Sequence, residues 1–345
     1  MSRPETNIGA PSHLEGRQKI GDLLLKYYIQ WLLVVAVIVL AALNGNFRQP
    51  NNLKNILLQS SFAGIGAAGM TLLITAGAFD LSVAGILGVC GVIMATSIAP
   101  TSTALGICAA LAVGVALGII NGLVVTKLRI PAFIATLGMM NVYLGLGFIW
   151  TNGQVVSVAQ PSQVSQTTGV VSAATPFVLT LGTGSLFGIL PVPFVVMAIV
   201  YGLCYLLFRR THFGRFLRAV GSSESAARTV GIPVARVRII AFAMVATCTA
   251  IAAVLLTAEL SSANAIMATG YELNAIAIVV VGGTSLQGGK GTLLGSFTGA
   301  LFFAVINNAL NIFGVGAYWQ YVVSGVLLIS AIAIQAVRSY VSAAE

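Results

Sequence analysis

Residues 209–238 read RRTHFGRFLRAVGSSESAARTVGIPVARVR, a charged stretch inside a chain that is otherwise almost uniformly apolar. This stretch contains seven of the 17 basic residues of the protein, and Glu224 is its only acidic residue. A charged side chain at the centre of a bilayer costs about 2.5–3.5 kcal/mol on insertion scales, so lipid cannot hold such a segment. We expect it to project into water between two membrane-embedded parts of the chain, where another molecule can bind it.

Composition identifies the chain as an integral membrane protein. Apolar residues make up 58% of it and charged residues 7%, against about 25% charged residues in a soluble domain. The net charge of +9 does not indicate nucleic-acid binding, because the basic residues lie at the edges of apolar runs. The four cysteines lie within apolar segments without metal-ligand spacing, so we interpret them as small buried apolar residues.

The expected fold class is all-α, a polytopic transmembrane helix bundle of about ten spans with an inverted internal repeat. A helix needs about 20 apolar residues to cross a bilayer. Residues 151–192 are uncharged but rich in Ser, Thr, Gln, Gly and Pro, and should form an external loop with a partly inserted helix at 176–190. The predicted spans are 28–44, 56–79, 81–99, 103–125, 132–150, 193–208, 239–260, 272–287, 292–313 and 318–337.

The basic residues predict the orientation of these spans, because cytoplasmic loops carry an excess of Lys and Arg. With ten spans and an internal N-terminus, 15 of the 17 basic residues lie inside, and only Arg48 and Lys54 face out. Both termini are therefore predicted to be cytoplasmic. The corresponding organisation is a cytoplasmic tail at 1–27, a membrane domain at 28–338 and a second cytoplasmic tail at 339–345.

Two pairs of short motifs suggest an internal repeat. In each half, an aromatic–acid–Leu–polar motif opens an apolar run and an Ile-Asn pair follows at a similar distance. The implied units, near 56–150 and 239–337, would have opposite orientations, which is a common transporter architecture. A chance match of such short motifs is the alternative. The pairs are Phe79-Asp80-Leu81-Ser82 with Tyr271-Glu272-Leu273-Asn274, and Ile120-Asn121-Gly122 with Ile306-Asn307-Asn308.

Glycines recur at four-residue intervals, at Gly114, Gly118 and Gly122 and again at Gly295 and Gly299. Such ridges let two helices approach closely. Helix packing is the favoured interpretation, and a surface that slides during gating is the alternative.

Two stretches match nucleotide-binding motifs only in part. The GxGxxG letters at 64–69 lie inside an apolar span with no preceding strand, and residues 283–292 have the wrong spacing for a P-loop. We therefore predict no nucleotide site and no cofactor on this chain. If the protein is an active pump, its energy comes from a partner or from an ion gradient.

The charged stretch contains the signals of one short helix. Ser222 or Ser223 can cap its start, Glu224 lies in its first turn, and Gly231 with Pro233 ends it. About eight residues give a helix of about 12 Å. Since such a helix is not stable alone in water, a docking surface on a partner is favoured over a merely solvated loop.

From about residue 50 to residue 337 the chain resembles the permease subunits of monosaccharide ABC importers, the ribose/xylose/arabinose permease family. Ala78 and Ala84 replace glycines that are common around Asp80 in this family, which leaves the substrate subgroup open. Ser222, Ser223 and Ser225 likewise replace the more typical residues around Glu224. The matching motifs are Gly69-Met70-Thr71, Phe79-Asp80-Leu81-Ser82-Val83, residues 131–137, Thr151-Asn152-Gly153, Gly270-Tyr271-Glu272-Leu273, residues 282–286, residues 288–291 and Asn307-Asn308.

The resemblance implies an assembly in the bacterial inner membrane. Its expected partners are a second permease copy or a paralogue, a cytoplasmic subunit pair that binds and hydrolyses ATP, and an external, periplasmic solute-binding protein. The cytoplasmic loop 209–238 would then contain the coupling segment that sits in a cleft of the ATPase. The coupling residues implied by the resemblance are Gly214, Arg215, Glu224, Ala226, Ala227, Arg228 and Gly231.

We therefore expect import of a neutral sugar or sugar-like solute by alternating access, and no catalytic residues on this chain. Polar residues within the apolar runs are pathway candidates, although helix–helix hydrogen bonds explain them equally well. For Asp80 and Glu272, stabilisation at a helix start is the further alternative. The pathway candidates are Asp80, Asn121, Thr136, Asn141 and Asn307, and the candidates for contact with the binding protein are Glu259, Asn264 and Glu272.

Two other classes of transport protein fit parts of the pattern. An ion-coupled secondary transporter would act without an ATPase, but acidic residues within the spans are scarce. A passive channel would move solute downhill without a partner. A membrane enzyme is disfavoured, because the sequence contains no nucleophile–base pair or metal cluster.

Overall fold

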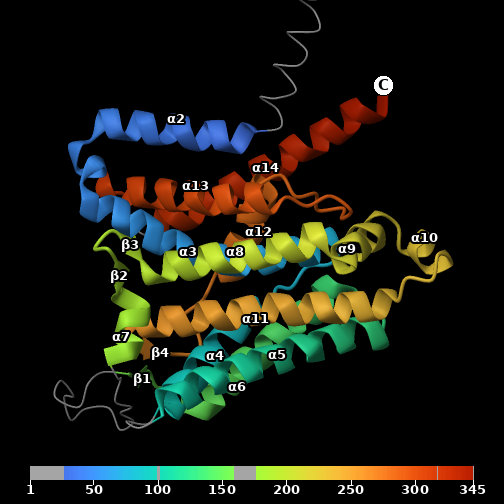
Figure 1. Ribbon diagram of the computed structural model, residues 1–345, viewed down its shortest axis with the longest axis horizontal. Coiled ribbons are helices and arrows are strands. Elements are labelled where there is room, and N and C mark those ends of the chain that lie inside the picture. The colour runs from blue at the N-terminus through green and yellow to red at the C-terminus, as the bar shows by residue number, and fades with distance from the viewer. Residues whose placement is uncertain (1–26, 99–101, 159–175, 317, 345) are drawn as a thin grey trace, which may run out of the picture.

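Helices form nearly all of the regular structure of the protein (Figure 1). The structure, a computed structural model, describes residues 27–98, 102–158, 176–316 and 318–344. Within this part the only other elements are four two-residue strands, which confirms the predicted all-α class. The elements are α2 (Tyr28–Leu43), η1 (Gly45–Arg48), α3 (Pro50–Thr75), α4 (Val83–Ser97), α5 (Thr103–Lys127), α6 (Ala132–Thr151), β1 (Val156–Ser157), α7 (Pro176–Thr183), β2 (Ser185–Leu186), β3 (Leu190–Pro191), α8 (Val192–Arg210), α9 (His212–Ser222), α10 (Glu224–Thr229), α11 (Val234–Leu260), β4 (Ser262–Ala263), α12 (Tyr271–Val281), α13 (Leu293–Ile312) and α14 (Tyr318–Ala344).

Six helices of the described part are long and apolar enough to cross a membrane: α3, α5, α6, α8, α11 and α13. Shorter apolar helices are α2, α4, α12 and the Tyr318–Ser330 part of α14. Each predicted span overlaps one of these helices. Length and composition thus support a protein that crosses the membrane many times.

Backbone signals rather than hydropathy decide where two of these helices begin or end. α3 begins at Pro50 instead of near 56, because proline fits the first helical position, where its missing N–H is not needed. α12 ends at Val281 instead of near 287, and Gly283 follows with a φ of 90°. That left-handed conformation favours glycine and does not continue a helix.

The uncharged region predicted as an external loop contains less helix than expected. α7 ends at Thr183 instead of extending to residue 190, and β2 and β3 then form an antiparallel hairpin. The hairpin turn contains Phe187 and Gly188, both with positive φ, which a helix cannot contain. β1 pairs with β4 and so joins this region to the end of α11. Residues 159–175 of the predicted loop lie outside the described residues.

The two predicted tails differ in how much of them is described. The tail at 1–27 lies outside the described residues except for Tyr27. In the tail at 339–345, α14 continues to Ala344, so its described part is helical.

Figure 1 shows α9 and α10 at one end of the bundle, and α7 with the short strands at the other. The connection between α12 and α13 reaches the α9–α10 end, because Gly289 packs against Ser222. The start of α2 lies beside the same connection, since the Tyr28 hydroxyl donates a hydrogen bond to the carbonyl of Val281. The charged stretch and the described part of the uncharged loop therefore lie at opposite ends of the bundle.

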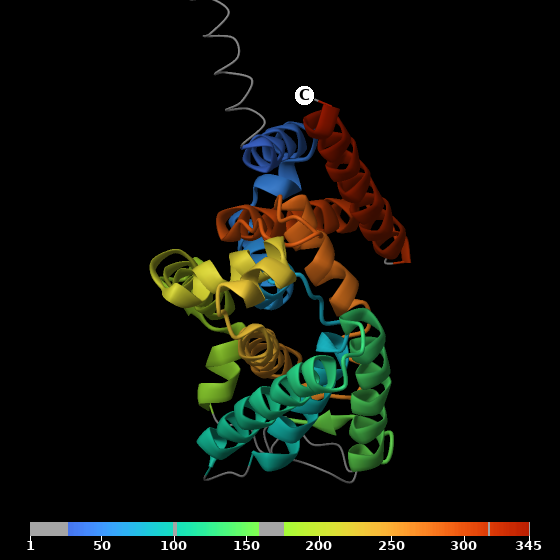
Figure 2. The same cartoon turned by 90° about the vertical axis from the view of Figure 1, so that its right-hand side faces the viewer.

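α11 occupies the middle of the bundle, and Figure 2 shows it nearly end-on among its neighbours. It packs on α3, α4 and α5. The first glycine ridge faces it: a Cβ built on Gly114 would lie 2.5 Å from the Cβ of Ala250, and one on Gly118 would lie 2.5 Å from the Cβ of Ala246. Real Cβ atoms do not approach so closely, so glycine is required for this helix contact, as the packing interpretation expects.

The second glycine ridge packs α13 on α12. A Cβ on Gly295 would overlap the carbonyl oxygen of Gly282, and one on Gly299 would lie 2.5 Å from that of Ile278. Both ridges thus allow backbone to touch backbone or a small side chain.

We expect Gly118→Ala to destabilise the protein by about 1–3 kcal/mol, because the added methyl pushes α5 away from α11. Thermal unfolding of the purified chain in detergent measures this as a lower melting temperature. Gly202→Ala on α8 is the matched control, since beyond its own stretch of helix no atom of the described residues lies within 4 Å of its new methyl group. A Gly118→Ala variant that melts like the control would contradict the close contact.

Candidate functional site

The first part of the charged stretch is an amphipathic helix, α9, that the sequence prediction missed. The hydroxyl of Thr211 caps its start by accepting a hydrogen bond from the N–H of Gly214 at 3.4 Å. Gly214 permits the sharp turn from α8, because a Cβ there would overlap the carbonyl oxygen of Phe208. Leu217 is buried and Arg215 is exposed. Apolar residues at helical spacing with arginines opposite were the sequence signal for this helix.

The predicted short helix is α10, with six residues rather than about eight. The hydroxyl of Ser223 caps it by accepting a hydrogen bond from the N–H of Ala226 at 3.3 Å. The helix ends where Gly231 adopts a φ of 79° and its N–H bonds to the carbonyl of Arg228. Of the predicted capping serines, the structure selects Ser223.

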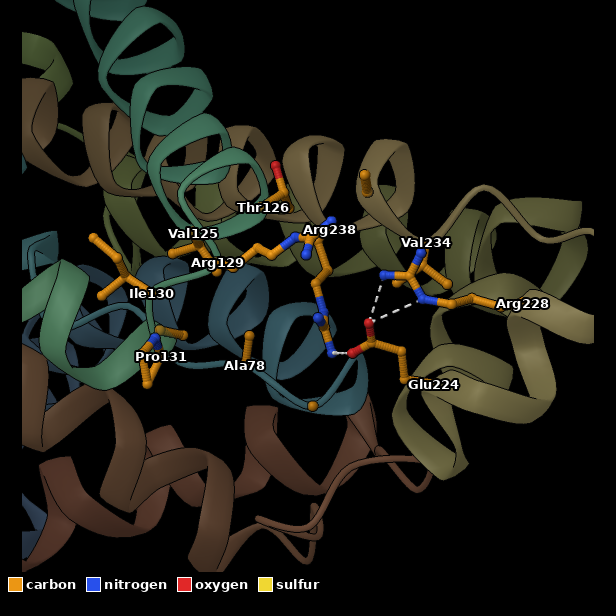
Figure 3. Close-up of a pocket in the computed structure, with 13 residues that line it drawn as sticks. Ala78, Val125, Thr126, Arg129, Ile130, Pro131, Glu224, Arg228, Val234 and Arg238 are labelled. Atoms are coloured by element: carbon orange, nitrogen blue, oxygen red, sulfur yellow. Dashed lines mark hydrogen bonds and ion pairs between the residues drawn. The ribbon is translucent and has the colours of Figure 1, made fainter.

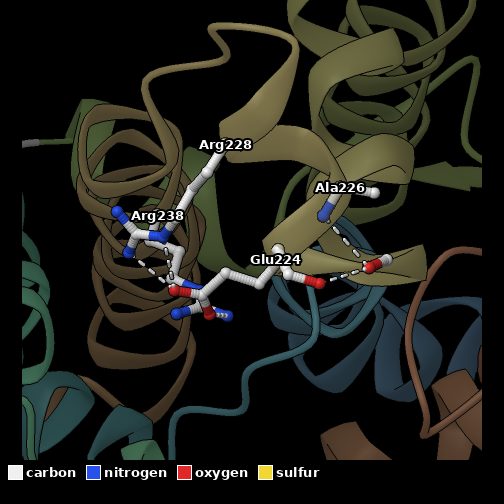
Figure 4. A network of polar contacts seen from close by, with 6 residues as sticks. Glu224, Ala226, Arg228 and Arg238 are labelled. Carbon is white, nitrogen blue, oxygen red and sulfur yellow. Dashed lines mark hydrogen bonds and ion pairs between the residues drawn. The ribbon is translucent and has the colours of Figure 1, made fainter.

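Glu224 ties α10 to the start of α11 through two ion pairs (Figure 4). One carboxylate oxygen lies 2.6 Å from Nη2 of Arg228, and the other lies 2.7 Å from Nη2 of Arg238. The first pair follows from the four-residue spacing on one helix. The second joins two helices across the turn between them, and sequence reasoning did not find it.

The same ion pairs keep Glu224 charged. The hydrogen bond from Arg228 is the main cause that holds the pKa of Glu224 below its usual 4.5; partial burial opposes this shift and the charge of Arg238 adds to it. A carboxyl whose pKa is lowered in the folded state stabilises that state above its usual pKa. Both ion pairs therefore persist at neutral pH and are lost only as the pH falls through the lowered pKa.

The outer surface of α10 is uncovered within the described part of the chain. Ala227 packs inward, whereas Ala226, Arg228 and Gly231 are exposed and Val230 is 75% exposed. This surface is made of small and partly apolar side chains and carries one positive charge, that of Arg228. It has the form expected of a face that docks on another protein.

Backbone contacts join this segment to the membrane helices. A Cβ on Gly221, near the end of α9, would overlap the carbonyl oxygen of Thr75 and lie 2.6 Å from the nitrogen of Gly289. The N–H of Gly289 in turn donates a hydrogen bond of 2.9 Å to the same Thr75 carbonyl. The end of α3, the end of α9 and the α12–α13 connection thus meet at one point without intervening side chains.

A cavity of about 540 Å³ opens beside the Glu224 ion pairs (Figure 3). Among the described residues that line it, three are arginines and Glu224 is the only acid. It lies between α10, the start of α11 and the α5–α6 turn, where Arg129 has a φ of 58°. The lining residues are Gly77, Ala78, Val125, Thr126, Arg129, Ile130, Pro131, Ala132, Glu224, Arg228, Val234, Ala235 and Arg238.

Three of the five pathway candidates meet in a buried polar network between α4, α5 and α6. Asp80 accepts hydrogen bonds from the N–H and hydroxyl of Ser82, at 2.8 and 2.6 Å, and from the amide of Asn121 at 3.0 Å. The carbonyl of Asn121 accepts a bond of 2.7 Å from Tyr143, and Thr136 accepts one of 3.1 Å from the N–H of Leu81. These side chains are at most 1% exposed.

This network holds the non-helical stretch between α3 and α4 in place. Its hydrogen-bonding groups are paired with one another, so helix–helix bonding accounts for Asp80, Asn121 and Thr136 in this conformation. The two remaining pathway candidates lie elsewhere. Asn141 is exposed on α6 and its amide donates to the carbonyl of Leu137, whereas Asn307 on α13 lines two cavities.

The three candidates for contact with a binding protein are not all at one place. Glu259 lies near the end of α11 beside Gly182 of α7, and Asn264 follows β4, where its side chain accepts a bond from the N–H of Ile266. Glu272 lies deeper. It is in the first turn of α12, and the neighbouring Tyr271 hydroxyl donates to a carbonyl half-way along α3, that of Phe62.

Comparison with known proteins places the chain in a family. Residues 52–332 match the family model described as branched-chain amino acid transport system / permease component. The ribose import permease protein of Escherichia coli K12 is 39% identical, over 87% of this chain and 90% of that protein. The corresponding protein of Bacillus subtilis 168 is 35% identical, over 95% and 96%.

The L-arabinose transport system permease protein of Escherichia coli K12 is 34% identical, over 94% of this chain and 93% of that protein. No solved structure matches the chain. The predicted relationship to sugar-importer permeases is confirmed, as is the prediction of a transport subunit rather than an enzyme. The chain is a multi-pass membrane permease that belongs to the branched-chain amino acid transport system permease component family.

Proposed function

We propose that this permease imports a neutral pentose-type sugar, driven by ATP hydrolysis on a separate cytoplasmic subunit that docks on α10. The single observation that carries the proposal is the uncovered face of α10, which Glu224 and Gly221 connect to the membrane helices. The substrate class is supported by the names of the ribose and L-arabinose relatives.

The proposed topology has ten spans with both termini in the cytoplasm. It is supported by the positive-inside distribution and by the arginine-rich α9–α10 segment at one end of the bundle. The proposed inverted repeat relates α3–α6 to α11–α14. Its support is that the second helix of each half, α4 or α12, is a short apolar helix entered from a non-helical stretch.

The coupling mechanism follows from the backbone contacts of α9. When the ATPase moves α10, the Glu224–Arg238 ion pair transmits the motion to α11. The contact of Gly221 with Thr75 and Gly289 transmits it to α3 and to the α12–α13 connection. Because no flexible side chain intervenes at Gly221, a displacement there is not absorbed locally, and the helices can alternate between two arrangements.

The remaining partners dock elsewhere on the permease. A solute-binding protein meets the opposite end, at α7, the β2–β3 hairpin and the neighbourhood of Glu259 and Asn264. A second copy or a paralogue completes the membrane unit. ATP is bound by the cytoplasmic subunit, and this chain needs no cofactor.

Reconstitution tests the function directly. Liposomes that contain the permease with its ATPase and binding protein should accumulate labelled D-ribose or L-arabinose. This accumulation should require ATP on the side of the membrane where the ATPase lies. The permease alone, under a proton or sodium gradient, should accumulate neither sugar. Gradient-driven accumulation by the permease alone would instead identify a secondary transporter.

A further inference from the structure

Two adjoining cavities lie where α12 meets α3, α13 and α14, away from the coupling segment. Their volumes are about 270 and 60 Å³, and Asn274 and Asn307 line both. The larger is also lined by Gln320, Tyr321 and Ser324 of α14. Polar side chains thus converge on one partly open space in an apolar bundle, a combination that is typical of a small-molecule site.

These cavities lie deep in the membrane part of the protein. α12 has 11 residues, or about 16 Å at 1.5 Å per residue, so it covers only about half of a bilayer core of about 30 Å. Its first residue is held half-way along α3, because the Tyr271 hydroxyl donates to the Phe62 carbonyl at 2.9 Å. Non-helical backbone at such depth occurs where it is buried or lines a cavity, and broken helices often mark transport sites.

The two asparagine amides have no protein partner within the described part of the chain. Each is only partly exposed, and each amide offers two donors and two acceptors. Polar groups inside an apolar bundle are normally paired, because a desolvated donor or acceptor without a partner is unfavourable. Two unpaired amides beside a shared cavity therefore point to a hydrogen-bonding guest.

The first half of the sequence offers a comparison for Asn274 and Asn307. When the paired motifs are aligned, Asn274 corresponds to Ser82 and Asn307 corresponds to Asn121. In the first half the amide of Asn121 donates directly to the Ser82 hydroxyl at 2.6 Å, and Asp80 completes a closed network. In the described part of the second half, no hydrogen bond joins the corresponding residues, Asn274 and Asn307. Both side chains face the two cavities instead.

Charge decides the class of guest. No Asp, Glu, Lys, Arg or His lines either cavity in the part of the chain that the structure describes. An amino acid carries an ammonium and a carboxylate, and neither would find a counter-charge here, whereas desolvating an unpaired charge is strongly unfavourable. Hydroxyl groups, which donate and accept like the amides, fit the lining.

We infer that Asn274 and Asn307 form a solute site inside the membrane that holds a neutral polyhydroxylated molecule and excludes amino acids. The inference rests on the proposed import function and assigns it a binding site. Asn274 and Asn307 contact the solute hydroxyls during passage, and Gln320 and Tyr321 bound the same space from α14.

The test uses the full transporter, permease with ATPase and binding protein, in proteoliposomes. Asn274→Leu and Asn307→Leu keep side-chain size but remove the amides. Initial uptake of labelled D-ribose and L-arabinose, and ATP hydrolysis stimulated by the sugar-loaded binding protein, are measured together. Each variant should lower uptake about tenfold, the effect of about 1.4 kcal/mol of lost hydrogen bonding, while ATP hydrolysis remains. Labelled L-leucine should not be taken up by the wild-type transporter.

Thr298→Val is the matched control on the same helix. It is also a polar-to-apolar change of equal size, and nine residues at 100° each place it on the opposite face of α13 from Asn307. Within the described part of the chain its hydroxyl donates to one group, the carbonyl of Leu294 on its own helix. This control should transport like wild type.

The other outcomes overturn the inference in distinguishable ways. Wild-type sugar uptake by both asparagine variants removes the site and leaves the proposed function standing. If the asparagine variants lose both uptake and stimulated ATP hydrolysis, the two asparagines support the fold or assembly of the transporter, and the solute site is not supported. Uptake of leucine by the wild type overturns the class of guest. Failure of the wild type to take up either sugar with ATP removes the proposed function, and the site with it.

Discussion

The Glu224→Lys variant should lose ATP-driven sugar uptake completely while the permease still inserts and folds. In the wild type, Glu224 neutralises Arg228 and Arg238 and fastens α10 to α11. The substitution places three positive charges at this point, so α10 swings away from α11 and its motion no longer reaches the membrane helices. Partly exposed ion pairs contribute only about 0.2–1 kcal/mol each, so the fold itself survives. Uptake in proteoliposomes and co-purification of the ATPase with the tagged permease measure the effect.

A charge swap separates coupling from general damage. Glu224→Lys combined with Arg238→Glu restores one attractive pair between α10 and α11 and should recover part of the uptake. Because the carboxyl of Glu224 is ionised at neutral pH, Glu224→Gln should fall between the wild type and the lysine variant. Normal uptake by Glu224→Lys alone would remove α10 from the coupling pathway.

Gly221→Val should give the second large effect. The new side chain meets the carbonyl of Thr75 and the nitrogen of Gly289, and backbone atoms cannot move aside as the tip of a side chain can. α9 is then separated from α3 and from the α12–α13 connection. Sugar uptake should be lost, whereas ATP hydrolysis by the assembled complex continues without transport, because the α10 surface itself is unchanged.

Gly202→Val on α8 controls for the substitution, since beyond its own stretch of helix a Cβ there meets no atom of the described residues within 4 Å. It should retain both uptake and sugar-dependent ATP hydrolysis. If Gly221→Val transports like this control, the three-way backbone contact is not the point where motion passes into the membrane helices.

Local signals in the sequence were sufficient to predict much of the structure of residues 209–238. Serine before Glu224 and glycine at 231 predicted the ends of α10, because caps act on neighbouring residues. The Arg228 partner of Glu224 follows from helical spacing. Arg238 does not, because its position depends on how the chain turns before α11.

Contacts between distant segments were beyond such reasoning. Thr75, Gly221 and Gly289 carry no motif that links them, and only the packing of α3, α9 and the α12–α13 connection brings them together. The pathway candidates show the same limit. Sequence reasoning grouped Asn121 with Asn307, but hydrogen bonding closes around the first and leaves the second at a cavity. Polarity within an apolar run does not say which of these two environments a residue has.

The folded state of α10 also bears on how quickly the transporter can cycle. Its cap at Ser223 and its ion pairs hold the helix in shape before anything binds it. A loop that became helical only on docking would lose conformational entropy at each encounter, and that loss would weaken the attachment. A preorganised helix avoids this penalty. In the proposed mechanism, the attachment of the ATPase to α10 can then be modest in area and still persist through repeated ATP hydrolysis, without the ordering step that a disordered segment would need.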